Sequence, residues 1–163
     1  MKHERNAQKP PDCTGKRFGL VAARFYYDVS EELIDGARRA LRDCHVGDDD
    51  VDLYEVPGCF EIPLACRNLI ETRHFDGLVA LGAVVRGATS HFEYVAGECA
   101  RGIMDVQLAT GIPIGFGILT TDTLEQAEER ANPKRGDKGY DAALAAALLV
   151  VTPANLPRAG FRS

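Results

Sequence analysis

The chain has 163 residues, of which 45% are hydrophobic and 26% are charged, and this is the balance of one ordinary globular domain. Its net charge of −5 argues against a nucleic-acid partner, because phosphate binding requires a clustered basic surface. No apolar run reaches the roughly 20 residues of a membrane span, and the N-terminus lacks a signal-peptide core, so we expect a cytoplasmic protein without a membrane partner.

Strand and helix patterns alternate four times along the chain. The first half predicts a strand over 17–23, a helix capped by Asp28 or Ser30 and ending near Cys44, a strand over 51–56, and a helix over 60–71. The second half predicts a strand over 77–85, a helix over 90–109, a strand over 112–119, and helices over 123–131 and 139–151.

This alternation requires parallel strands joined by right-handed crossovers, with helices on both faces of the sheet. The predicted fold is therefore α/β, a flavodoxin-like three-layer sandwich with a four-stranded parallel sheet. Residues 15–152 would form the domain. Residues 1–14 would be a flexible N-terminal arm and residues 153–163 a C-terminal tail.

The cysteines and histidines show neither disulfide nor metal-site spacing. The five cysteines contain no C-x-x-C pair, and an odd number in apolar patterns fits a reducing compartment. They are Cys13, Cys44, Cys59, Cys66 and Cys99. We expect no metal.

Ligands of such folds bind beyond the carboxyl ends of the strands. Four segments must lie at that edge, one after each predicted strand: RFYYD, PGCFEIP, RGATSH and TTDT. No G-x-G-x-x-G, P-loop or G-x-S-x-G motif accompanies them, so a nucleotide cofactor is poorly supported.

His91 lies where the third predicted strand ends and the next helix begins. Ser90 and Glu93 fit a capping box, in which Glu93 returns to the Ser90 amide. His91 would then be the first helical residue, where the positive end of the helix dipole favours a neutral imidazole that can accept a proton. The alternative is a histidine that only packs at a helix start.

The other polar residues at this edge have structural alternatives. Arg86 could hold an anion, but pairing with Glu61 or Glu93 is the more frequent case. Glu61 could bind a polyol, but helix capping is more frequent.

Position alone leaves the roles of two further groups of residues undecided. Phe25 and Tyr26 could stack on a planar ligand, although position favours closing the core. A basic run near the C-terminus is usually a solvated loop, yet it is the best phosphate candidate in an acidic chain. It comprises Arg130, Lys134, Arg135 and Lys138.

Five segments, in this order and spacing, resemble the lumazine synthase family of riboflavin biosynthesis. They are ARFYYD, VPGCFEIPLA, ALGAVVRGATSHFEYV, GIPIGFGILTTDTLEQAEER and KRGDKGYDAA. The resemblance covers about residues 16–152. It implies condensation of 5-amino-6-(D-ribitylamino)uracil with 3,4-dihydroxy-2-butanone 4-phosphate to 6,7-dimethyl-8-ribityllumazine, phosphate and water, with neither metal nor organic cofactor.

The resemblance also implies roles for individual residues. Phe25 would stack on the pyrimidine, Val84 and Val85 would line the ring, and His91 would transfer protons. The segment that binds the ribityl chain would contain Gly58, Phe60 and Glu61.

A second set of residues would reach the site from a neighbouring subunit. By resemblance these are Phe116, Lys138 and Arg130, with Arg130 on the phosphate. The family forms rings of five subunits, which some members close into shells, and an association with riboflavin synthase is also implied.

Three positions depart from the family pattern: Tyr26, Cys59 and the pair Asn132-Pro133. The stiff, cationic turn 132–136 and the pair Pro10-Pro11 lead us to expect a free pentamer rather than a shell. A non-catalytic flavin or lumazine carrier is the alternative function, which the presence of His91 and Arg130 disfavours.

Overall fold

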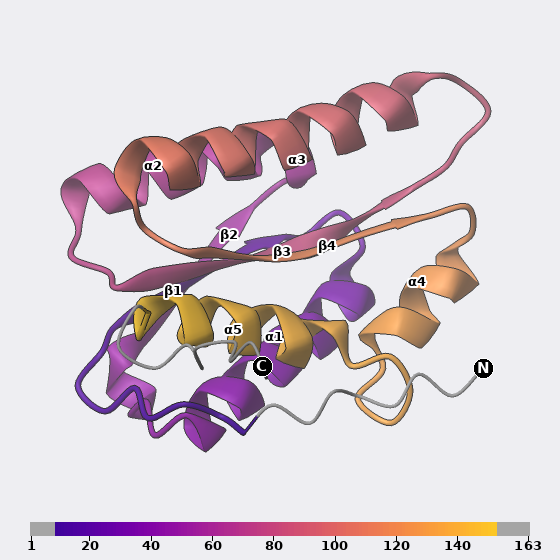
Figure 1. Cartoon of the computed structure of the whole chain (residues 1–163). Helices are drawn as coiled ribbons and strands as arrows, with labels where there is room; N and C mark the ends of the chain where they lie inside the picture. Colours follow the sequence, from indigo (N-terminus) through magenta and orange to yellow (C-terminus); the bar gives the residue numbers. More distant parts are fainter. Residues whose placement is uncertain (1–8, 153–163) are drawn as a thin grey trace, which may run out of the picture.

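The structure, a computed structural model, describes residues 9–152. Its centre is a parallel sheet with helices on both faces (Figure 1). The strands are β1 (Phe18–Ala23), β2 (Val51–Val56), β3 (Gly77–Val85) and β4 (Ile114–Thr121), in the order β2-β1-β3-β4. β4 is therefore an edge strand.

The helices form the two outer layers. One layer holds α1 (Tyr27–Asp43), α4 (Leu124–Ala131) and α5 (Lys138–Val150), and the other holds α2 (Ile62–Thr72) and α3 (His91–Thr110) (Figure 1). Two short 3₁₀ turns, η1 (Asp48–Asp50) and η2 (Cys59–Glu61), flank β2. The predicted α/β sandwich is confirmed.

Two hydrophobic cores explain why the layers form. One lies between the sheet and the α1 layer and contains Leu20, Leu33 and Val79, and the other lies against α2 and α3 and contains Val21, Cys66 and Ile103. Alternate residues of β1 and β3 enter opposite cores, because successive side chains of a strand point to opposite faces. This is why both strands are almost wholly apolar.

The strands over 51–56 and 77–85 have the predicted bounds, whereas β4 starts two residues late. The predicted caps of α1 are wrong. The helix begins at Tyr27, after Tyr26, which makes no side-chain cap bond. Ser30 lies inside the first turns, where its hydroxyl donates to the Tyr27 carbonyl at 2.8 Å.

The packed part of the chain reaches into the segment expected to be an arm. Cys13 is buried, and its amide donates to the Cys44 carbonyl at 2.8 Å. Residues 1–8 of the arm and the predicted tail, 153–163, lie outside the described residues.

Candidate active site

A hollow of about 520 Å³ lies at the carboxyl ends of β1, β2 and β3. Three of the four predicted edge segments line it, together with the first turns of α3. We call it the strand-end hollow, and its lining residues are Phe25, Tyr26, Pro57, Gly58, Cys59, Phe60, Glu61, Ala83, Val84, Val85, His91, Tyr94 and Val95.

Apolar groups line the inner part of the hollow. Ala83 and Val84 are buried and Val85 is half-buried. The Cys59 thiol is also buried, with its Sγ 3.7 Å from the Ala83 carbonyl oxygen. A hydrogen bond with Cys99, together with burial, raises the pKa of Cys59, so this thiol stays neutral near pH 7.

Two exposed aromatic rings stand among the lining residues. Phe25 is 74% exposed and Phe60 is 59% exposed. The ring of Phe25 meets the half-buried ring of Tyr26 edge to face, at 5.0 Å between centroids. The expectation from position alone that Phe25 closes the core is therefore wrong. Its free face is available for stacking on a planar ligand.

Glu61 caps the turn that follows β2. Its carboxylate accepts a hydrogen bond from the Gly58 amide at 3.0 Å, which closes a capping box around η2. Glu61 therefore does cap, but it caps the turn η2 and not the predicted second helix, because it makes no side-chain cap bond at the start of α2. The side chain is exposed beside the hollow, so its remaining lone pairs face solvent.

His91 is the first residue of α3 and lies on the wall of the strand-end hollow, as the sequence indicates. The predicted capping box around it is wrong, because Ser90 makes no side-chain cap bond. The His91 amide instead has a long contact, 3.4 Å, with the Thr89 hydroxyl.

Arg86 explains why the capping box fails. Its guanidinium binds the Glu93 carboxylate and, at 3.0 Å, that of Asp122, and it lies 4.4 Å from the centroid of the Phe92 ring. The hydrogen bond from Arg86 lowers the pKa of Glu93. The pairing alternative for Arg86 is thus confirmed with Glu93, and Glu61 is not its partner. Arg86 ties the first turn of α3 to the end of β4.

The three residues expected from a neighbouring subunit lie elsewhere in this chain. Phe116, Arg130 and Lys138 line a second hollow, of about 410 Å³, between β4, α4 and α5. We call it the edge-strand hollow, and none of its lining residues lines the strand-end hollow. Arg130 donates to the Gln126 carbonyl at 3.1 Å, and Lys138 pairs with Asp141 at 3.2 Å.

Tyr94 and Val95 line the strand-end hollow without having been identified from the sequence. They follow His91 at helical spacings of three and four residues, which place all three on one face of α3. That spacing was the available signal. Within residues 9–152, no group of three His, Cys, Asp or Glu side chains could hold a metal ion.

Fold and hollow together define a class of protein: a flavodoxin-like α/β sandwich with a hollow at the carboxyl ends of its parallel strands, the edge at which ligands of such folds bind. Over residues 15–153 the chain matches the model of the family described as 6,7-dimethyl-8-ribityllumazine synthase. No helix of the described residues is long and apolar enough to cross a membrane.

Two curated relatives carry the same name. They come from Desulfatibacillum aliphaticivorans and Syntrophus aciditrophicus (strain SB), and each is 48% identical over 136 residues, which are 83% of this chain and 88% of the relative. The chain therefore belongs to the 6,7-dimethyl-8-ribityllumazine synthase family.

Proposed function

We propose that this chain condenses 5-amino-6-(D-ribitylamino)uracil with 3,4-dihydroxy-2-butanone 4-phosphate to 6,7-dimethyl-8-ribityllumazine, phosphate and water, the penultimate step of riboflavin biosynthesis. Membership of the family supports this reaction. The observation that carries it in the structure is the strand-end hollow, where an exposed Phe25 ring and His91 line one apolar cavity.

The lining residues suit a flat ring with a polyol chain. The Phe25 ring stacks on the pyrimidine, and Val84 and Val85 contact its edge. The ribityl hydroxyls bind at the turn after β2, where Gly58, Phe60 and Glu61 meet the hollow. The exposed Glu61 carboxylate keeps acceptor capacity for hydroxyl donors while it caps η2.

His91 moves the protons. Joining an amine to a carbonyl with loss of water, and then releasing phosphate, requires protons to leave nitrogen and carbon and to reach oxygen. An imidazole is the side chain suited both to accepting and to donating a proton near neutral pH. His91 lines the hollow and is the first residue of α3.

Phosphate recognition belongs to Arg130, assisted by Lys138. Both residues line the edge-strand hollow with Phe116, and not the strand-end hollow. We propose that the edge-strand hollow of one subunit closes the strand-end hollow of the next. This arrangement supplies each site with the cation that a phosphorylated substrate needs.

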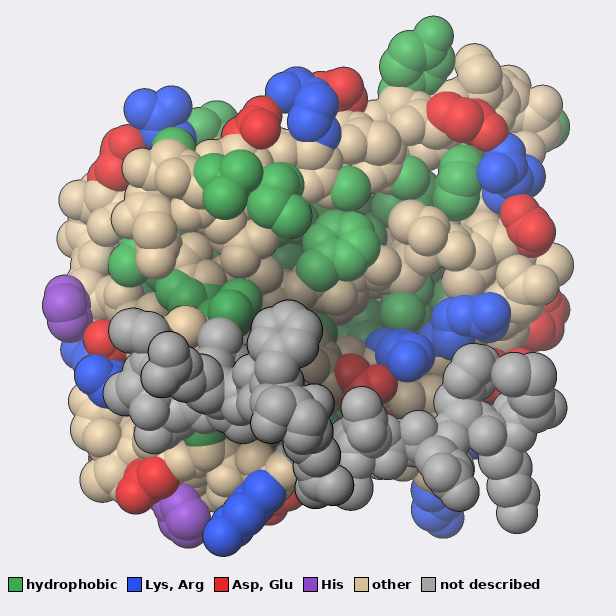
Figure 2. Space-filling model, viewed as in Figure 1, with side chains coloured by type: hydrophobic (Ala, Val, Ile, Leu, Met, Phe, Trp, Pro, Cys, Tyr) green, Lys and Arg blue, Asp and Glu red, His purple; other side chains and the backbone are tan. Residues whose placement is uncertain are grey.

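The surface around β4 supports such a contact. Hydrophobic side chains gather there, between the α3 layer and the α5 layer (Figure 2). Phe116 of β4 is 48% exposed, and on α3 Met104 is 52% and Leu108 78% exposed. A soluble chain with such a patch on an edge strand is expected to cover it with a partner. The chain would therefore assemble into a homopentamer, which acts in the cytoplasm. Association of this pentamer with riboflavin synthase is testable by co-purification.

The test mixes purified protein with both substrates and follows lumazine fluorescence and inorganic phosphate together. An enzyme releases the two in equal amounts, faster than the mixture without protein. A carrier of lumazine or flavin binds added lumazine but releases no phosphate. Equal rates with and without protein would exclude the proposed activity.

A further inference from the structure

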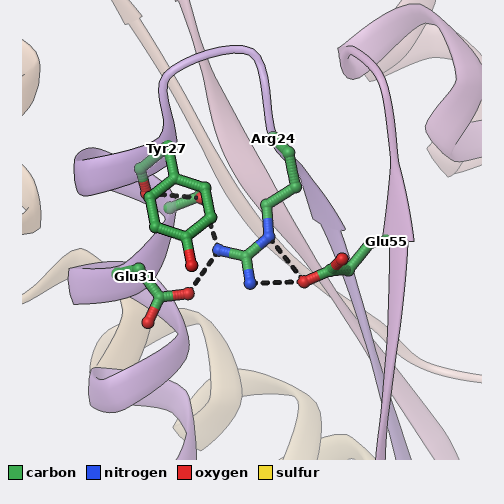
Figure 3. A network of polar contacts seen from close by, with 5 residues as sticks. Arg24, Tyr27, Glu31 and Glu55 are labelled. Carbon is green, nitrogen blue, oxygen red and sulfur yellow. Dashed lines mark hydrogen bonds and ion pairs between the residues drawn. The ribbon is translucent and has the colours of Figure 1, made fainter.

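Arg24 holds the short connection between β1 and α1 (Figure 3). Its Nε donates to Glu55 of β2 at 2.8 Å, and Nη2 donates to the same carboxylate. On the other side, Nη1 donates to the Ser30 hydroxyl at 2.9 Å and to Glu31 of α1. The guanidinium also lies over the Tyr27 ring, 4.7 Å from its centroid.

This network differs from arginine pairs that lie within a single helix. Arg101 binds Glu98 and Asp105 of its own helix and is 63% exposed. It therefore does not link one element to another. The Arg24 side chain is 16% exposed and binds two different elements through its planar fork. Without it, Glu31 and Glu55 would face each other unneutralised.

The connection that Arg24 holds carries Phe25. Residues 24–26 belong to neither β1 nor α1. The Phe25 ring is 74% exposed, and its ring contact is with the neighbouring Tyr26. Packing therefore restrains this ring weakly, and its direction depends on the backbone of the connection. Arg24 fixes that backbone through its side chain and through its amide, which donates to the Val56 carbonyl at 2.9 Å.

We infer that Arg24 is a positioning residue: by tying the β1–α1 connection to β2 and α1, it holds the Phe25 ring over the strand-end hollow and so sets the affinity for the planar ring of the ligand. The inference rests on the proposed function. Arg24 does not line the hollow, so its effect passes through Phe25.

The experiment measures binding of 6,7-dimethyl-8-ribityllumazine to the full chain by the fluorescence of the ligand. Arg24→Gln should weaken binding about tenfold, within the range that loss of one stacking contact produces. Arg24→Lys keeps the charge but not the fork, so it should weaken binding to a similar extent. Arg101→Gln, which also breaks an arginine pair, should leave binding unchanged.

A double-mutant cycle then asks whether Arg24 acts through Phe25. In a Phe25→Ala background, Arg24→Gln should weaken binding no further. An undiminished effect in that background, or full rescue by Arg24→Lys, would overturn the inference. If Arg24→Gln does not fold, Glu55→Gln, which weakens only the β2 side of the network, replaces it with the same expectations.

The design separates this inference from the proposed function. Binding needs no turnover, so a chain without synthase activity still answers whether Arg24 positions Phe25. If Phe25→Ala weakens binding and Arg24→Gln does not, the inference alone fails. If Phe25→Ala leaves binding unchanged, stacking by Phe25 fails and the positioning role fails with it.

Discussion

Glu93, in the first turn of α3, bonds to the guanidinium of Arg86 and not to the amide of Ser90. A hydrogen bond between two charged groups is stronger than one between a carboxylate and a backbone amide of the same geometry. His91 is therefore placed by a link between Arg86, just after β3, and the first turn of α3, and not by a capping box.

His91→Ala should lower turnover by about 10²–10⁴-fold, the usual range for loss of a general acid–base group. Activity should persist above the uncatalysed rate, because holding the two substrates together still contributes. Ser90→Ala is the control, since Ser90 makes no cap bond and its loss should change neither turnover nor stability by much. Wild-type turnover in a folded His91→Ala variant would exclude the proton-transfer role.

Arg130→Lys should raise the Michaelis constant for the phosphorylated substrate about tenfold or more and leave that for the pyrimidine nearly unchanged, because Lys cannot offer two parallel donors to a phosphate. Arg135→Lys is the matched control. Arg135 pairs with Glu129 at 3.0 Å and does not line the edge-strand hollow. Steady-state kinetics decide the point, and equal effects on both constants would contradict it.

The starts of α3 and α4 differ in whether the side chain in the first turn forms a capping bond or an ion pair. α4 begins with a complete capping box, in which the Thr123 hydroxyl accepts from the Gln126 amide at 3.2 Å and Gln126 returns to the Thr123 amide. At the start of α3 no such box forms. The difference is that no arginine draws the Gln126 side chain away, and an amide carries no charge to attract one.

Thr123→Ala should therefore destabilise the chain by about 1 kcal/mol, the usual cost of removing a bonded N-cap. Ser90→Ala at the start of α3 should cost less than about 0.5 kcal/mol. Denaturant unfolding of both variants measures the difference. Equal losses would mean that the two helix starts are capped alike in solution.

At the scale of the whole molecule, we expect the buried thiols to make the free energy of unfolding depend on pH in the alkaline range. Burial raises the pKa of Cys66 from 9.0 to about 12, and burial likewise raises that of Cys44 to about 12. A raised folded pKa means that the folded chain holds protons that the unfolded chain has lost. The stability that these bound protons contribute is fully present below pH 9.0 and is lost as pH rises towards about 12.

The free energy of unfolding should thus fall as pH rises above about 9, by at most about 1.4 kcal/mol per pH unit for each such thiol. Cys66→Ala should make the fall shallower, because one group no longer contributes. Denaturant unfolding between pH 8 and 10.5 gives the slopes. A variant slope as steep as that of the wild type would mean that Cys66 titrates normally in the folded chain.

The assembly is the largest-scale prediction. We expect a free pentamer, because the turn after α4 exposes Pro133, Lys134 and Arg135, and bulky cations pack poorly around a tight symmetry axis. Light scattering coupled to gel filtration should give about five times the 17.7 kDa chain. A megadalton particle would show a shell instead. An active monomer would rule out the shared site.

Periodicity and spacing alone determined the elements, the parallel sandwich and most residues of the strand-end hollow. These features are predictable because a strand or helix is specified by residues adjacent in the chain, and because parallel strands bring their carboxyl ends to one edge. The bounds of β2 and β3, and the position of His91 at the start of α3, follow from such local patterns.

Only the tertiary structure decided which side chains meet and which residues remain apart. Arg86 finds Asp122 across 36 positions of sequence, and Arg24 finds Glu55 across 31. The exposure of Phe25 and the division of the candidate residues between two hollows are likewise set by the tertiary structure. No local pattern contains them, because the partner of a charged or aromatic group is chosen by competition among everything that folding brings near it.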